Sequence, residues 1–266
     1  FSQGRFLGLA VVPGHAEPVA LSAGLGEQGT QVFHIGDLWE KLLYGDQPAG
    51  WFIAGEKEII AAMPREEFAR YFHDQYTALN SVVCIAGNFD ASKIRKKVAG
   101  YFGETPARLP KRKKPKTKEV QSAPNMLVEQ RKTDQMHLML GVRGYGVFDP
   151  RKYALSVLEV ILGGNMSSRL WHEIREQRGL AYYVSSENEF YTDSGFFVTR
   201  AGVNVSKTEE TVRIILNEYR NTARDGVLDA ELRMAKSFLI GKLHLGIETA
   251  SNKASFIGQQ EVLLNK

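Results

Sequence analysis

The six histidines of this 266-residue chain bear on the most specific chemistry that a short motif could predict. Two histidines four residues apart on a helix, together with glutamates, can hold zinc and activate a water molecule. No histidine here has a second histidine four residues away, and the six stand alone at His15, His34, His73, His137, His172 and His244. In WHEIRE, Glu176 occupies the position after His172 where a second histidine would be needed. We therefore predict no metal ligands and no catalytic residue from this pattern, and interpret His172 as a helix-surface residue.

The strongest local signal is LGGNMSSRLWHEIREQRGLAYYV, residues 162–184, in which a glycine pair leads into a helix of alternating charges that ends at Gly-Leu-Ala-Tyr-Tyr. The glycines could suggest a phosphate-binding loop, but neither Gly-Lys-Ser nor Gly-Lys-Thr follows them. A tight turn that seats the following helix is the better interpretation of GGNMSS.

This segment resembles the signature of the C-terminal half of insulinase/pitrilysin-type zinc metallopeptidases, a family that includes processing peptidases and respiratory-complex core proteins. LLYGDQPAGWFIAG at 42–55, residues 63–90 and YFGETP at 101–106 resemble the N-terminal half of that family, after its metal-binding helices. With ETASNKASFIGQQE near the end, the resemblance covers roughly residues 35–264. It implies an α+β fold of two homologous halves, each an antiparallel sheet with helices packed on one face.

By this resemblance, the substrate-positioning arginine and tyrosine of the family fall on Arg175 and Tyr182. A guanidinium offers several fixed donors to peptide carbonyls, and a phenol can hydrogen-bond the oxyanion that develops during peptide cleavage. Plainer interpretations stay open: Arg175 could pair with Glu173 or Glu176 on a solvated helix, and Tyr182 could be an ordinary strand aromatic. The adjacent Tyr183 should face the opposite side of the strand.

The family takes its zinc from an H-x-x-E-H motif, which this chain lacks. The resemblance therefore implies zinc in the family and none bound to this chain alone. Residues 1–33 are glycine-rich and unlike the two amphipathic helices that the family has at that place. We expect a truncated gene, a changed reading frame or a divergent module there, and both ends look incomplete beside the family.

The elements that must position Arg175 and Tyr182 follow from the spacing of apolar residues. That spacing predicts helices at 64–76, 91–102, 153–162, 170–177 and 229–245. One further helix should begin near Lys207, with Ser206 and Glu209 as a capping box. Alternating or β-branched residues predict strands at 81–86, 136–142, 181–190 and 195–204. Grouped strands and grouped helices favour an α+β fold with helices on one face of an antiparallel sheet.

Charge and composition divide the chain further. The net charge of +4 comes from residues 105–118, which hold seven basic side chains and no acidic one, so the remainder is slightly acidic. The run KRKKPK lacks aromatic residues that could stack on bases, and we expect no nucleic-acid binding. Apolar runs are too short for a membrane span. We predict four parts: an atypical segment 1–34, the rest of an N-terminal half 35–106, a basic proline-rich linker 107–124, and a C-terminal half 125–266.

The resemblance implies that the chain is the substrate-binding portion of a zinc-dependent metalloendopeptidase, and that it cannot cut peptides alone because it lacks the zinc motif. The expected partners are a peptide or unfolded polypeptide substrate and either a zinc-bearing subunit or a second copy of the chain. The alternative is a non-catalytic structural or assembly subunit of the same family, which the retention of Arg175 and Tyr182 disfavours. A bacterial protein of the cytoplasm or periplasm is expected.

Overall fold

The computed structural model describes residues 8–12, 27–111, 113–130 and 135–264. It divides into a sheet unit, which runs to Phe52 and resumes over Lys116–Leu239, and a helical unit, Ile53–Pro115 with the residues from Ile240 onward. None of the described helices is long and apolar enough to cross a membrane. The strands are β1 (Gly8–Val12), β2 (Asn125–Val128), β3 (Met136–Arg143), β4 (Ala181–Phe190) and β5 (Gly195–Val203). The α-helices are α1 (Glu27–Tyr44), α2 (Lys57–Ala62), α3 (Arg65–Gln75), α4 (Ala91–Phe102), α5 (Lys152–Leu162), α6 (Thr208–Asp225), α7 (Asp229–Gly246) and α8 (Ala250–Leu264).

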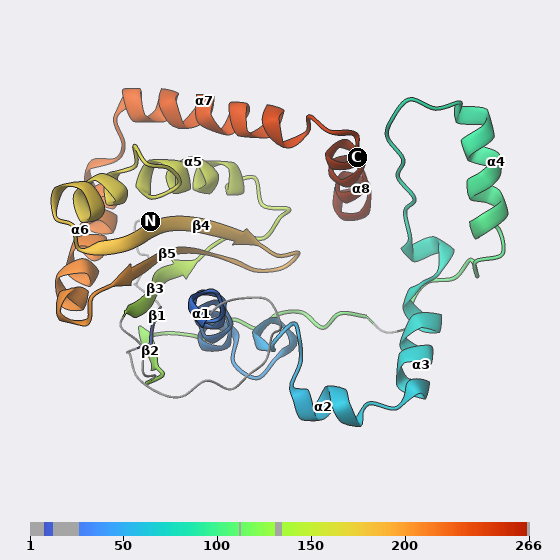
Figure 1. The fold of residues 1–266 in the computed structure, drawn as a ribbon, viewed down its shortest axis with the longest axis horizontal. Coiled ribbons are helices and arrows are strands. Elements are labelled where there is room, and N and C mark those ends of the chain that lie inside the picture. The colour runs from blue at the N-terminus through green and yellow to red at the C-terminus, as the bar shows by residue number, and fades with distance from the viewer. Residues whose placement is uncertain (1–7, 13–26, 112, 131–134, 265–266) are drawn as a thin grey trace. The chain divides into compact units, whose positions relative to one another are not determined.

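The strands of the sheet unit form one sheet in the order β2-β1-β3-β5-β4 (Figure 1). Its neighbouring strands are antiparallel except for β1 and β2, which are parallel. A parallel pair needs a long connection, and the chain supplies one from residue 13 to residue 124. The α+β class is confirmed, whereas the sheet differs from the purely antiparallel one that was expected. The predicted β3, β4, β5, α5 and α7 agree with the structure to within about two residues.

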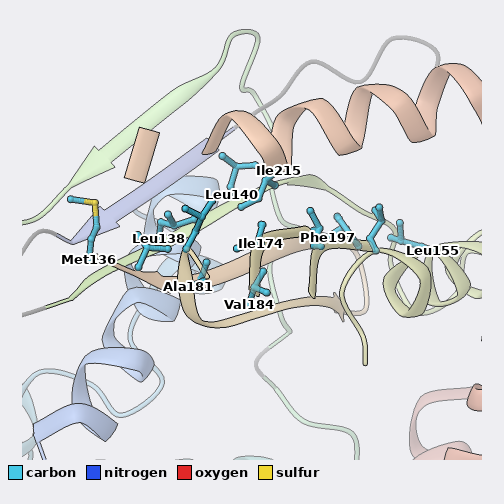
Figure 2. Close-up of a cluster of buried hydrophobic side chains, with 14 residues drawn as sticks. Met136, Leu138, Leu140, Leu155, Ile174, Ala181, Val184, Phe197 and Ile215 are labelled. Carbon is cyan, nitrogen blue, oxygen red and sulfur yellow. The ribbon is translucent and has the colours of Figure 1, made fainter. Parts of the chain in front are cut away.

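One face of the sheet is covered by α5, by a short helix at Trp171–Gln177 and by α6. Their apolar side chains meet those of β3, β4 and β5 in a buried cluster, here called the helix-side cluster (Figure 2). Its buried members are Met136, Leu138, Leu140, Leu155, Leu162, Leu170, Ile174, Leu180, Ala181, Val184, Phe197, Ala201, Val203 and Ile215.

The other face of the sheet is covered by α1. Its buried side chains Ile35, Leu38, Trp39, Leu43 and Tyr44 pack on Met139, Phe196 and Val198. Helices therefore lie on both faces of this sheet, where the sequence indicated one face. The physical reason is that α1 has an apolar stripe of its own, at helical spacing, which must be buried against a second surface.

A further layer lies outside α5 (Figure 1). Val160 and Ile161 of α5 are buried against Ala235 of α7. Because Leu155 and Leu162 of the same helix face the sheet, α5 is apolar on two sides. Such a helix belongs between two layers, and it separates the sheet from α7.

The helix-side cluster also contains a chain of hydroxyl groups that satisfy one another. Ser186 Oγ lies 2.8 Å from Thr199 Oγ1, which lies 2.6 Å from the Tyr219 hydroxyl. The Tyr219 hydroxyl donates to the Leu140 carbonyl at 3.1 Å. A buried polar group is costly unless it is hydrogen-bonded. These hydrogen bonds satisfy the hydroxyl groups and link β4, β5, β3 and α6 in one network.

In the helical unit, the helices predicted at 64–76 and 91–102 are confirmed as α3 and α4. Asp90 begins α4, because its carboxylate accepts from the backbone nitrogens of Ser92 at 2.9 Å and Lys93 at 3.1 Å. The strand predicted at 81–86 is wrong. In the part of the chain that the structure describes, that segment pairs with no strand, and a strand forms only when its backbone has a partner.

The helix predicted to begin near Lys207 is confirmed as α6, but its first turn is capped differently from the prediction. Asn204 accepts from the backbone nitrogen of Ser206 at 3.0 Å and from its hydroxyl at 2.8 Å. These bonds close a 3-10 turn at Val205–Lys207, and α6 begins after it at Thr208. The expected capping box of Ser206 and Glu209 is therefore wrong, because Asn204 competes for the serine.

The loop after α5 packs directly on β4. The Ser186 backbone nitrogen donates to the Gly163 carbonyl at 3.0 Å. A Cβ atom at Gly163 would lie 2.3 Å from Ser186 Oγ and 2.5 Å from Ser186 N, closer than real carbon atoms approach. The tight-turn interpretation of GGNMSS agrees with this geometry, since only glycine lets the two backbones meet.

Gly163→Ala is expected to lower the free energy of unfolding of the sheet unit by about 1–3 kcal/mol, because the added methyl group overlaps Ser186 and forces β4 to shift. The measurement is urea unfolding followed by tryptophan fluorescence. All three tryptophans of the chain lie in the sheet unit, so the signal reports that unit.

Gly36→Ala in α1 is the matched control. A Cβ atom there would lie 3.4 Å from Arg200 Nη2, which is ordinary contact with the end of a flexible side chain. Alanine in a helix interior should stabilise the unit by about 0.5–1 kcal/mol. Equal midpoints for the two variants would contradict the close packing of Gly163 on β4.

Candidate functional site

The helix that carries Arg175 is held by its buried residues. Leu170 and Ile174 are fully buried in the helix-side cluster. The sequence predicted a helix at 170–177, and residues 171–177 form one with the wider winding of a π-helix. Apolar residues four apart suit both windings, so the sequence pattern alone could not tell them apart. Short π-helical segments occur often at functional sites.

The connection from this π-helix to β4 is closed by a glycine and one backbone hydrogen bond. Gly179 has a φ of 59°, the left-handed conformation that glycine commonly adopts where a helix ends. The next residue, Leu180, donates from its backbone nitrogen to the Ile174 carbonyl at 2.9 Å. The start of β4 is thus tied to the buried middle of the helix.

Arg175 is exposed on the π-helix, and its guanidinium lies over an indole. The guanidinium carbon is 4.9 Å from the Trp171 ring centroid. The two carboxylates that could have paired with it are bonded elsewhere: Glu173 accepts from Arg178 at 2.7 Å, and Glu176 lies 2.8 Å from His172 Nδ1. The alternative in which Arg175 pairs with Glu173 or Glu176 is not what the structure shows.

Tyr182 is the extra residue of a β-bulge. Ala181 pairs with Val203 and Tyr183 pairs with Gly202, so Tyr182 has no opposite residue on β5. Its side chain is 54% exposed, and no hydrogen bond to its hydroxyl is found among the described residues. It lines a pocket of about 320 Å³ together with Gly179, Leu180, Ala181, Asn204, Ser206 and Lys207. Arg175 does not line this pocket, so the structure places both predicted residues on one connection without joining them in one cavity.

Tyr183 has a different environment from its neighbour. Its hydroxyl lies 2.8 Å from Nδ1 of the buried His137, and the two rings stack. Burial raises the pKa of Tyr183 to about 12 and lowers the pKa of His137. A Cβ atom at Gly202 would lie 2.3 Å from the Tyr183 ring, so the ring fits only over a glycine. Tyr182 is therefore the tyrosine available to a ligand.

Arg169, which the sequence analysis did not single out, lies two residues before the π-helix at the centre of an ion-pair network. It donates from Nε and Nη2 to both carboxylate oxygens of Glu231, each at 2.6 Å. Its Nη1 donates to Glu218 at 2.8 Å and to Thr222 Oγ1 at 3.1 Å. The Glu231 hydrogen bonds, and after them those to Glu218, raise the pKa of Arg169 above its ordinary value. Its partners lie about 50–60 residues away in the sequence, so no local spacing could have revealed them.

Comparison with known proteins identifies the family of this chain. Residues 62–239 match the family model described as the peptidase M16 inactive domain. An uncharacterized zinc protease of Mycobacterium leprae is 35% identical over 236 residues, which cover 87% of this chain and 53% of the relative. An uncharacterized zinc protease of Bacillus subtilis is 35% identical over 232 residues, 87% of this chain and 56% of the relative.

Solved structures support the same fold. A peptidase M16 inactive domain from Pseudomonas fluorescens superposes with a TM-score of 0.76 at 23% identity, covering 86% of this chain and 54% of that one. The fold is an α+β domain like that of the solved M16 inactive domain, and it carries an exposed arginine and tyrosine on a helix-to-strand connection. The chain belongs to the peptidase M16 family, through the domain described as inactive. It spans about half the length of the curated relatives it matches.

Zinc belongs to this family, since the relatives are named zinc proteases. Within the described ranges, no three histidine, cysteine, aspartate or glutamate side chains gather in a group that could hold a metal ion. His34 and Glu129, 3.0 Å apart, supply a pair of such side chains but not a set of three. The described residues therefore do not fit a zinc site.

Tyr183→Phe is expected to lower the free energy of unfolding by about 0.5–1.5 kcal/mol, because it removes the hydroxyl that satisfies buried His137. Tyr182→Phe should change it by less than about 0.5 kcal/mol, because that hydroxyl faces solvent. Urea unfolding of both variants, followed by tryptophan fluorescence, makes the comparison. If Tyr182→Phe cost as much as Tyr183→Phe, the assignment of Tyr182 as the solvent-facing tyrosine would be wrong.

Proposed function

We propose that residues 125–266 are the substrate-binding half of a zinc metalloendopeptidase, and that Arg175 and Tyr182 hold the backbone of an extended peptide. One observation carries this proposal. Both side chains are exposed on a connection fixed by buried residues, while neighbouring charged side chains such as Glu173 and Arg169 are bonded within the chain. Polar groups for which the described residues supply no hydrogen-bond partner, held on a rigid support, are suited to a ligand.

The chemistry of the two side chains suits a peptide. The guanidinium of Arg175 can donate two parallel hydrogen bonds to backbone carbonyls. The Tyr182 phenol can donate one hydrogen bond to a carbonyl or to the oxyanion formed from it. The pocket beside Tyr182 is large enough for one side chain of the peptide. Binding and orientation are thus the tasks of this chain.

Cleavage itself would need zinc and a water-activating glutamate from elsewhere. The family draws these from an H-x-x-E-H motif, and the natural partner is a subunit or domain that contains it. A second copy of these 266 residues would bring no such motif. A homodimer alone would therefore bind peptides without cutting them. The relatives named above are bacterial, which supports a bacterial origin, and a cytoplasmic or periplasmic location stays a prediction.

Peptide binding should weaken when either side chain is altered. Arg175→Ala is expected to raise the Kd for a fluorescein-labelled unstructured peptide about 10-fold or more, because a hydrogen bond from a charged donor is worth about 1.5–3 kcal/mol. Tyr182→Phe should raise it about 2- to 10-fold. Fluorescence anisotropy at fixed ionic strength measures both.

The matched controls are Arg220→Ala in α6 and Tyr153→Phe in α5, both exposed and neither lining the Tyr182 pocket. They should leave the Kd unchanged. If the wild-type chain bound no peptide at all, the result would favour the alternative, a non-catalytic assembly subunit. If the control variants raised the Kd as much as Arg175→Ala does, non-specific electrostatic or apolar binding would account for the signal.

The purified chain should contain no stoichiometric zinc and should not cleave a quenched peptide, with or without a chelator. The physical reason is that its described residues offer no set of three metal ligands. Elemental analysis and the cleavage assay, both on the same purified sample, measure this. Chelator-sensitive cleavage by the chain alone, together with one zinc per chain, would contradict the proposal that this chain binds the peptide and a partner supplies the zinc.

A further inference from the structure

Arg169 joins three elements at one point. Its guanidinium fork is bidentate to Glu231 of α7, and its remaining amino group reaches Glu218 and Thr222 of α6. Glu231 also accepts from the backbone nitrogen of Leu228 at 2.8 Å, which fixes the connection from α6 to α7. Because the planar guanidinium is hydrogen-bonded along two of its edges, both the orientation and the position of the Arg169 side chain are fixed, which a single flexible contact would not achieve.

The burial of this network separates it from an ordinary surface pair. The side chains of Arg169, Glu218 and Glu231 are each only 22–23% exposed. Water therefore screens the charges less than it does at the surface. One guanidinium faces two carboxylates, so without Arg169 two negative charges would be left close together. The start of the π-helix is thereby bound to α6 and α7.

The far end of the π-helix has a second tie to α6. Arg178 donates to Glu173 inside the helix and lies 3.6 Å from Glu210 in the first turn of α6. Trp171 and Arg175 lie between Arg169 and Arg178, one helical turn apart, with the guanidinium over the indole. The orientation of Arg175 thus depends on a helix that is held at both ends by arginines.

We propose that Arg169 is a positioning residue for Arg175: by fixing the start of the π-helix to α6 and α7, it holds the Trp171–Arg175 pair where a bound peptide meets it. This inference rests on the proposed function of Arg175. Arg169 is itself largely covered and bonded, so it acts through the helix and not by contact with the peptide. A role in stability alone would leave Arg175 equally well oriented in every folded variant.

A double-mutant cycle tests this role. Arg169→Lys keeps the charge but loses the fork, and it should raise the peptide Kd about three- to tenfold when Arg175 is present. In the Arg175→Ala background the same change should have no further effect, because there is no guanidinium left to position. Hydrogen–deuterium exchange should show faster exchange confined to residues 171–177. Equal effects of Arg169→Lys in both backgrounds, or unchanged exchange at 171–177, would overturn the proposal.

Two further variants serve as a control and as a substitute for Arg169→Lys. Arg151→Lys is the matched control, because Arg151 donates from Nε to Oδ1 and from Nη2 to Oδ2 of Asp149 in a bidentate contact at an exposed site. This variant should change neither the Kd nor the exchange. If Arg169→Lys fails to fold, Glu231→Gln replaces it, because it weakens the same bidentate contact without removing side-chain volume. Glu231→Gln should also raise the peptide Kd when Arg175 is present and should have no further effect on the Kd in the Arg175→Ala background. Loss of binding in Arg175→Ala alone would leave the proposed function standing and refute the role of Arg169, whereas no binding by the wild type would refute both.

Discussion

Burial of β5 on both faces is the constraint on which the rest of the sheet unit depends. Side chains alternate along a strand, so Phe197 and Ala201 point to the helix-side cluster while Phe196 and Val198 point to α1. Burying a large apolar side chain contributes about 1.5–3 kcal/mol to stability. Leaving the side chains on either face of β5 exposed to water would lose this free energy. Two cover layers are therefore needed, and α1 supplies one of them although more than 150 residues separate it from β5.

The same burial explains why Tyr182 faces solvent. In a regular strand, Ala181 and Val184 would lie on opposite faces, because they are three residues apart. Both are buried in the helix-side cluster, which is possible only if one extra residue stands between them. The bulge accommodates that residue, and Tyr182 is the one left outside. Exposure of the candidate phenol is thus a consequence of core packing, and it fixes Tyr183 over Gly202 at the same time.

The elements whose patterns are local could be predicted from the sequence, and those that depend on distant partners could not. β3, α4 and α5 follow from the spacing of their own apolar residues. The roles of Arg175 and Tyr182 rest on the resemblance of one continuous motif and stay a prediction. The parallel β1–β2 pair, the α1 face and the Arg169 network each join residues far apart in the chain. Residues 81–86 show the converse error, because a local strand pattern without a pairing partner forms no strand in the part of the chain that the structure describes.

Charge pairing around the π-helix accounts for the availability of Arg175. An arginine between Glu173 and Glu176 would ordinarily pair with one of them, yet Glu173 is held by Arg178 and Glu176 lies beside His172. Arg175 instead lies over Trp171, and a cation over an aromatic face is attracted through that face. The N–H groups of a guanidinium lie in its plane and point outward from its edge, so they remain available as hydrogen-bond donors while the indole contacts the face. The neighbouring ion pairs and the indole together keep a charged, oriented donor at the surface, and a peptide carbonyl can accept from it without first displacing a carboxylate.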